Sequence, residues 1–148
     1  MSAFRAIYRF WVSLMTVAVV VQIAFAGYGA FTAAHKASKS TLNDDAFSHG
    51  FNAHAALGTI LVPAALLLFL ISIGTMEKRR ILQSFGVFAL FVAQILLGWT
   101  GADAPYILGA LHPVNAVIIL GFLGSITYRE WHGAQAVRAE PAVSAPPA

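Results

Sequence analysis

The chain has 148 residues, of which 59% are hydrophobic and only 10% are charged. With a mean hydropathy of +0.75, this composition excludes an ordinary soluble domain, in which about a quarter of the residues are charged. The absence of cysteine excludes disulfides, thiolate ligands and iron–sulfur clusters. The net charge of +3 comes without a long basic run, so the sequence gives no reason to expect nucleic acid binding.

Four apolar stretches, at residues 10–31, 53–73, 81–99 and 107–128, contain no Asp, Glu, Lys or Arg. Each is long enough to cross a hydrocarbon core of about 30 Å, which takes roughly 20 residues of helix. Because these apolar runs are continuous rather than alternating, they favour helices over a β-barrel. The sequence therefore predicts an all-α fold, an integral membrane four-helix bundle.

The first run follows Arg5 and Arg9 and ends near small residues, as a signal peptide does. We expect it to remain as a helix, since it is longer than the roughly 7–15 apolar residues of a signal peptide. Within it, Gln22, Ala26 and Gly29 share one helical face. One amide and two small residues on a face are typical of helix packing inside a membrane.

The distribution of basic residues predicts how the helices cross the membrane. One side of the predicted bundle has Lys36 and Lys39, whereas the other side has seven basic residues: Arg5, Arg9, Lys78, Arg79, Arg80, Arg129 and Arg138. By the positive-inside rule, both termini and the loop between the second and third helices are cytoplasmic.

Residues 32–50 predict a polar outer loop, in which Asn43-Asp44-Asp45 marks a turn or a helix start. We expect its histidines, His35 and His49, to be solvated, although His49 is close enough in sequence to the second run to reach over a site there. That run has His54 near its outer start, Gly58 one turn further on and Pro63 in its middle, where we expect a kink.

The third run repeats the first. Its residues Gln94, Gly98 and Gly101 follow Gln22, Ala26 and Gly29 at a constant offset of 72. The histidines repeat as well, since His112 follows His54 by 58 residues. The chain thus predicts two pseudo-repeated helix hairpins of the same orientation, related by an axis roughly along the membrane normal.

In the fourth run Pro113 follows His112 directly, so we expect a bend at this histidine. Beyond the run, the Ala- and Pro-rich segment 132–148, which includes His132, predicts a disordered cytoplasmic tail. The predicted transmembrane domain is therefore residues 1–131.

Two histidines at equivalent points of a repeat are the strongest candidates for function, because ionisable groups inside a membrane are costly. His54 and His112 should approach the bundle axis from opposite sides at similar depth. Two neutral imidazoles can clamp one metal, and haem iron suits them because the porphyrin supplies four further nitrogens. A bare zinc or copper ion would need more ligands, and Gln22, Gln94 and Asn115 are the polar groups within reach.

The predicted site therefore holds one haem b with His54 and His112 as iron ligands. The other members of the site are polar residues in the helices, small residues that leave a slot, and outer residues that can meet the propionates: Gln22, Gln94, Asn115; Ala26, Gly58, Gly98, Ala116; Lys36, Lys39 and Tyr106.

A histidine at the outer start of the second helix and another, in a Leu-His context, at the outer start of the fourth resemble one half of haem A synthase, a membrane enzyme built from two such four-helix halves. The resemblance covers residues 10–128 and implies a bis-histidine haem pocket formed by His54 and His112, in a bacterial cytoplasmic membrane. The family's catalytic glutamate, three positions before the first histidine, is Phe51 here, and the cysteine pair of many bacterial members is missing. We therefore favour a non-catalytic haem protein that transfers electrons or carries haem within a larger complex.

Other interpretations stay open. The chain is alternatively a haem-free accessory or assembly subunit of a respiratory or photosynthetic membrane complex, with its histidines bonding across helices. It is also similar in length to a half-size haem A synthase-like enzyme, which would regain two halves as a homo-oligomer or within a larger membrane redox complex. A small transporter is a weaker interpretation, because no carboxylate lies within the predicted spans.

Overall fold

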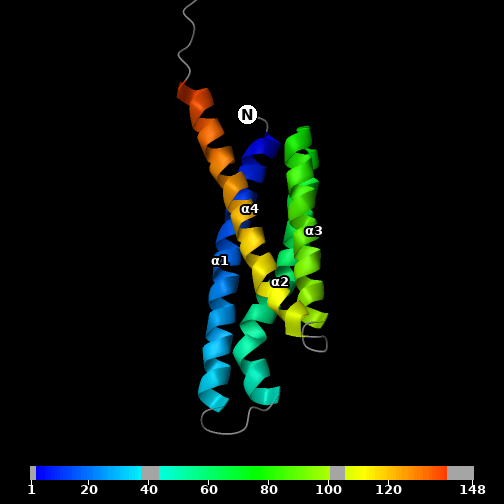
Figure 1. Cartoon of the computed structure of the whole chain (residues 1–148). Coiled ribbons are helices and arrows are strands. Elements are labelled where there is room, and N and C mark those ends of the chain that lie inside the picture. Colours follow the sequence, from blue (N-terminus) through cyan, green and yellow to red (C-terminus); the bar gives the residue numbers. More distant parts are fainter. Residues whose placement is uncertain (1–2, 38–43, 101–105, 140–148) are drawn as a thin grey trace, which may run out of the picture.

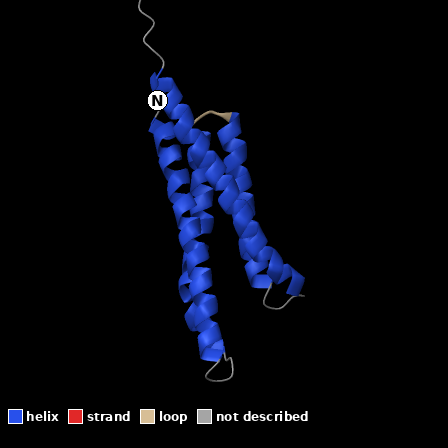
Figure 2. Ribbon diagram, turned by 60° about the vertical axis from the view of Figure 1, so that its left-hand side comes forward, coloured by secondary structure: helices blue, strands red, loops and turns tan. Residues whose placement is uncertain are grey.

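The computed structural model describes residues 3–37, 44–100 and 106–139. These residues form four helices, α1 (Ala3–Ala37), α2 (Asp44–Ile73), α3 (Lys78–Thr100) and α4 (Tyr106–Ala139). Successive helices run antiparallel, and α4 packs back against α1, so the four helices form a closed ring in which α2 and α4 are diagonal (Figure 1). No strand interrupts them in the described part of the chain (Figure 2). The predicted all-α four-helix architecture is confirmed.

Each of the four helices is long and apolar enough to cross a membrane. Their outward faces are also apolar, as Phe10 and Phe31 show with 72% and 80% of their surfaces exposed. A large apolar surface of this kind on a monomer marks contact with lipid or with another protein. These features favour a multi-pass membrane protein.

The helices are longer than the apolar runs predicted. The polar loop expected at 32–50 is largely helical, because α1 continues to Ala37 and α2 already begins at Asp44, the predicted helix start. Segments 38–43 and 101–105 lie outside the described residues. An apolar run marks only the stretch that would lie in hydrocarbon, whereas helical hydrogen bonding continues into flanks of good helix formers such as alanine. The α1–α2 hairpin consequently reaches further than the α3–α4 hairpin at the end away from the N-terminus (Figures 1 and 2).

The fourth helix also continues past the predicted domain boundary at 131, as far as Ala139. His132 therefore lies in a helix, where its Nδ1 donates to the Tyr128 carbonyl at 2.9 Å and its ring stacks on the Tyr128 ring. The predicted tail is thus helical up to Ala139, and residues 140–148 lie outside the described residues. Pro63 and Pro113 both lie inside continuous helices.

The core is a seam of side chains spaced three and four residues apart along each helix. This spacing turns one stripe of each helix toward the bundle axis. The fully buried members are Tyr8, Val12, Met15 and Val19 of α1, Leu61, Ala65 and Leu68 of α2, Val87 and Phe91 of α3, and Ile119, Leu123 and Ile126 of α4. This seam holds the four helices in register over the length of the bundle.

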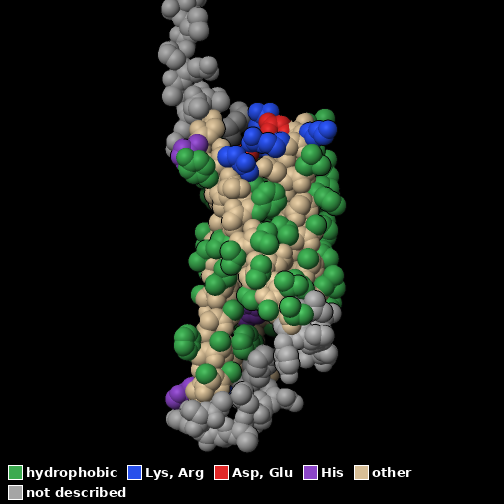
Figure 3. Space-filling view, in the orientation of Figure 1, with side chains coloured by type: hydrophobic (Ala, Val, Ile, Leu, Met, Phe, Trp, Pro, Cys, Tyr) green, Lys and Arg blue, Asp and Glu red, His purple; other side chains and the backbone are tan. Residues whose placement is uncertain are grey.

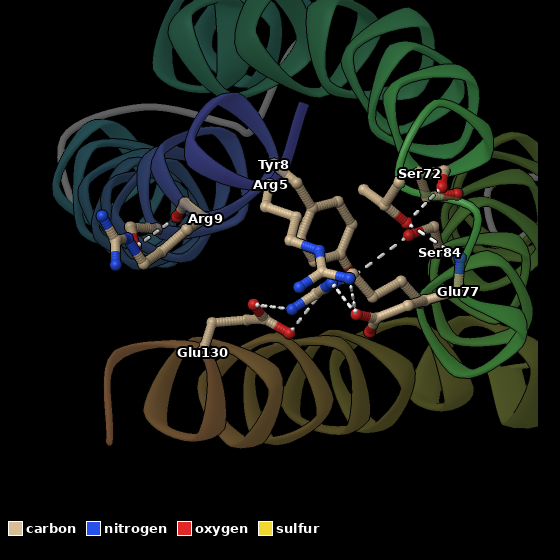
Figure 4. A network of polar contacts seen from close by, with 10 residues as sticks. Arg5, Tyr8, Arg9, Ser72, Glu77, Ser84 and Glu130 are labelled. Carbon is tan, nitrogen blue, oxygen red and sulfur yellow. Dashed lines mark hydrogen bonds and ion pairs between the residues drawn. The ribbon is translucent and has the colours of Figure 1, made fainter. Parts of the chain in front are cut away.

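Charged side chains gather at the end of the bundle where α1 begins and α4 ends (Figure 3). There Arg80 of α3 makes two contacts with the buried carboxylate of Glu130 in α4, at 3.0 and 2.9 Å, and one with Glu77 at 2.7 Å. Beneath them, Ser84 and Tyr8 share a hydrogen bond of 3.2 Å between α3 and α1 (Figure 4). Because a paired buried charge is costly to separate, this network ties α1, α3 and α4 together at one end.

Candidate functional site

The two histidines of the repeat face each other across the ring of helices. His54 lies on α2 and His112 on α4, and their ring centroids are 6.1 Å apart with the ring planes inclined by 62°. Because α2 and α4 are diagonal, the two imidazoles meet across the bundle rather than along a shared helix interface. The two imidazoles thus approach each other from opposite sides of the bundle, as the sequence predicted.

Each histidine exchanges two hydrogen bonds with a glutamine of the preceding helix. Gln22 Nε2 donates to the His54 carbonyl at 2.7 Å, while His54 Nδ1 lies 3.1 Å from the Gln22 carbonyl oxygen. In the second hairpin Gln94 Nε2 donates to the His112 carbonyl at 3.0 Å, and His112 Nδ1 lies 3.1 Å from the Gln94 carbonyl oxygen. The sequence repeat is therefore a repeat of contacts.

These bonds determine which ring nitrogen is available. A carbonyl oxygen can only accept, so Nδ1 of each histidine carries the proton in this arrangement. In a neutral imidazole the other nitrogen, Nε2, then has a free lone pair. A histidine whose Nδ1–H is bound to a backbone carbonyl is the usual form of a metal-ligating histidine. Both His54 and His112 are thus held in the tautomer that can bind a metal through Nε2.

The second hairpin has a further support that the first lacks. Asn115 Nδ2 donates to Gln94 Oε1 at 2.7 Å and to the Leu90 carbonyl at 3.0 Å. The position equivalent to Asn115 in the first hairpin is Leu57, and Gln22 Oε1 is buried without a hydrogen-bond partner among the described residues. Asn115, which the sequence predicted as a member of the cofactor site, thus bonds to Gln94.

Two predicted slot residues make room for the site's own side chains. A Cβ placed on Gly58 would lie 3.0 Å from Gln22 Nε2, and one placed on Gly98 would lie 3.2 Å from His112 Cε1. Both distances are shorter than ordinary van der Waals contact, so a side chain at Gly58 would press on the glutamine that orients His54, and one at Gly98 would press on His112 itself. The glycines hence permit the glutamine–histidine pairs to form.

A cavity of about 200 Å³ adjoins the two histidines, and all four helices contribute to it. Its polar members are His54, His112, Gln22 and Gln94, and its remaining wall is apolar: Val19, Ile23, Ala26, Leu61, Phe91, Pro113, Ala116, Val117 and Ile119. Sequence reasoning missed six apolar members of the wall: Val19, Ile23, Leu61, Phe91, Val117 and Ile119. The three- and four-residue spacing of the apolar stripe could have identified Val19, Leu61, Phe91 and Ile119, because they belong to the buried seam.

The donor set suits one class of metal cofactor. The described residues contain no cluster of three or more His, Cys, Asp or Glu, so they offer a bare ion too few ligands. Two imidazoles that share one metal at about 2.0–2.1 Å per bond have ring centroids roughly 6 Å apart, and the observed separation is 6.1 Å. This separation is compatible with a metal that brings its own equatorial ligands, as a porphyrin does.

Several residues near the histidines were singled out in the sequence: Phe51, His35, His49, Lys39 and Tyr106. Phe51 packs edge-on against His54, with centroids 6.1 Å apart, and covers Gly29, so an aromatic ring occupies the space beside this histidine. His35 and His49 are exposed. The expected propionate partners Lys39 and Tyr106 have side chains outside the described residues.

Comparisons with protein-family models, with curated proteins and with solved structures find no match for this chain.

Proposed function

We propose that the chain is a multi-pass membrane protein that binds one haem b through His54 and His112, for electron transfer or as a haem-carrying subunit of a larger complex. One observation carries the proposal: two imidazoles face each other at 6.1 Å, each with Nδ1 on a backbone carbonyl. The proposal accords with the resemblance to one half of haem A synthase.

The residues around the cavity have two different roles in this proposal. Gln22 and Gln94 orient the imidazoles through their backbone carbonyls, and the rest of the cavity wall is apolar. A bound haem would supply one-electron chemistry at its iron. A haem held by both His54 and His112 would have no position left on its iron for oxygen, which favours electron transfer over oxygen activation.

The proposed orientation places the haem toward the outer face of a bacterial cytoplasmic membrane. The cationic end of the bundle, where α1 begins and α4 ends, would be cytoplasmic by the positive-inside rule (Figure 3). His54 lies in the first part of α2 and His112 in the first part of α4, and both helices start at the opposite end. The cofactor would therefore be accessible to partners on the outer side.

An optical spectrum tests the proposal. The detergent-purified protein should be red and should show, on reduction, the sharp visible bands of a six-coordinate low-spin haem. A preparation that stays colourless, and that takes up no haem when it is added, would overturn the proposal.

That negative result would favour the haem-free accessory subunit. One observation supports this second candidate: the four glutamine–histidine bonds are complete without any ligand, so the same residues can serve to join helices. In that case removal of His54 or His112 would lower the stability of the bundle without changing any spectrum.

Synthesis of haem A by this chain is a separate question. Phe51 stands where the resembled enzymes have a carboxylate, and its ring packs against His54, so this position supplies no acid beside the proposed haem. We expect that cells lacking their own haem A synthase will accumulate no haem A when they express this chain. Its appearance in the extracted haems would show that the chain is a half-size enzyme.

A further inference from the structure

A second cavity, of about 220 Å³, lies at the opposite end of the bundle from the histidines. Side chains from α1, α3 and α4 line it, and five of its eight lining residues are arginines: Arg5, Arg9, Arg79, Arg80, Arg129, Glu130, Gly133 and Ala134. Neither the proposed haem nor the helix packing requires so many guanidinium groups around one space.

The acidic residues at this end account for only two of the five arginines. Arg80 is paired with Glu130 and with Glu77, and Arg5 shares the Glu77 carboxylate at 3.0 Å. Two carboxylates are thus committed to two arginines, and a guanidinium network of this kind is locally neutral.

The other three arginines have no carboxylate partner within residues 3–37, 44–100 and 106–139. Arg9 lies over the Trp131 ring, 4.5 Å from its centroid, and its Nε is buried without a hydrogen-bond acceptor. Arg129 donates to Ser125 Oγ at 3.3 Å, and Arg79 lines the cavity from α3. Figure 4 shows the Arg9 guanidinium turned away from Glu77 and Glu130. A buried unpaired donor is costly, so this end of the bundle is built for an acceptor from outside the chain.

From this arrangement we infer that the cavity binds a phosphate group. Guanidinium forks match phosphate oxygens in pairs, and charge-assisted bonds of this kind are the strong ones. Basic pockets between transmembrane helices on the cytoplasmic side bind anionic lipid headgroups. The indole of Trp131 and the phenol of Tyr128, both exposed beside the cavity, suit the membrane interface.

A topological role alone does not explain the convergence. The positive-inside rule needs cations on one side of the membrane, but it does not need them to point into one cavity. Lys78 meets the topological requirement from an exposed position that is not part of the cavity wall. It therefore serves as the matched control: a cation at the same end, outside the proposed site.

The source of the phosphate is either the headgroup of an anionic phospholipid or a soluble phosphate, and one experiment with two arms separates them. In the first arm, native mass spectrometry measures retention of phosphatidylglycerol and of phosphatidylcholine by the detergent-purified protein. In the second, lipid-free protein is heated with inorganic phosphate or with chloride at equal ionic strength. Circular dichroism shows whether each variant has kept its helices.

We expect phosphatidylglycerol to be retained in preference to phosphatidylcholine. Arg9→Gln and Arg129→Gln should each weaken this retention about tenfold, the effect of losing one charge-assisted bond, and Lys78→Gln should leave it unchanged. Arg129 is exposed, so its variant keeps the test valid if Arg9→Gln does not fold.

Stabilisation by inorganic phosphate alone, with the same dependence on Arg9 and Arg129, would identify a soluble phosphate as the ligand. Equal retention of the two lipids without any effect of inorganic phosphate, or arginine variants that behave like Lys78→Gln, would overturn the inference. Both arms are independent of haem.

Discussion

The two hairpins hold their histidines by the same contacts but support those contacts differently. In each, a glutamine on the first helix and a histidine on the second exchange a pair of bonds. Asn115 donates a hydrogen bond to the amide oxygen of Gln94. The equivalent residue of the first hairpin, Leu57, has no donor to offer, and the amide oxygen of Gln22 has no partner among the described residues. The repeat thus keeps the bonds that orient the imidazoles and lets their surroundings vary. We therefore expect His112 to be held more rigidly than His54.

The small residues of the site also differ between the hairpins, because each glycine of one hairpin corresponds to an alanine of the other. Gly58 of the first hairpin corresponds to Ala116 of the second, and Gly98 of the second corresponds to Ala26 of the first. Each hairpin therefore has one glycine where a histidine or its glutamine comes close, and an alanine that lines the cavity instead. Each glutamine–histidine pair thus has one glycine beside it, on α2 in the first hairpin and on α3 in the second.

The largest effect should come from removing either histidine. His54→Ala and His112→Ala should each abolish the six-coordinate low-spin spectrum, because each takes away one of the two proposed axial ligands. His35→Ala and His132→Ala, which change exposed histidines, are the controls and should keep the spectrum. Absorption spectra of the oxidised and reduced proteins provide the measurement. Loss of the spectrum in a control would mean that His54 and His112 are not the pair that binds the haem iron.

Replacing Asn115 should destabilise the second hairpin. Asn115→Leu leaves Gln94 Oε1 without its donor, as Gln22 Oε1 is in the first hairpin, and should lower the free energy of unfolding by about 1–2 kcal/mol. Unfolding in mixed micelles measures this, with Asn52→Leu as the control, because Asn52 is exposed on α2. Equal losses for the two variants would show that the Asn115–Gln94 bond has no special importance.

The two glycines should be sensitive to a single methyl group. Gly58→Ala and Gly98→Ala place a Cβ 3.0 and 3.2 Å from Gln22 Nε2 and His112 Cε1 respectively. Each should unfold about 1 kcal/mol more easily than Gly27→Ala, which meets nothing within 4 Å and gains helix propensity. If all three variants are equally stable, the close contacts do not restrain the histidine sites.

The smallest effect should come from giving the first hairpin the missing donor. Leu57→Asn offers Gln22 Oε1 a partner but loses packing against the core, so its stability should stay within about 0.6 kcal/mol of the original. Leu57→Ala loses the packing without the donor and should be the less stable of the two. A Leu57→Asn variant no better than Leu57→Ala would imply that Gln22 Oε1 needs no partner.

The sequence alone was sufficient for the four helices and the pairing of positions between hairpins. These features follow from local rules, because an apolar run long enough to span a membrane is helical wherever it lies. The constant offset of 72 between Gln22 and Gln94 already related the two hairpins, and the offset of 58 already matched His54 with His112. Equivalent residues of a repeat occupy equivalent places, so their meeting across the bundle could be predicted.

Only the tertiary structure decided what each of those residues touches. Asn115 and Gly58 were predicted members of the cofactor site, and the structure adds that Asn115 bonds to Gln94 and that Gly58 lies close to Gln22. Contacts of this kind depend on the rotation and depth of the helices, which the sequence does not specify. The helix ends also moved, as the polar flanks around Ala37 and Asp44 continue the helices. The arginine cavity draws on three helices, and charges far apart in sequence converge there because antiparallel packing brings the start of α1 and α3 beside the end of α4.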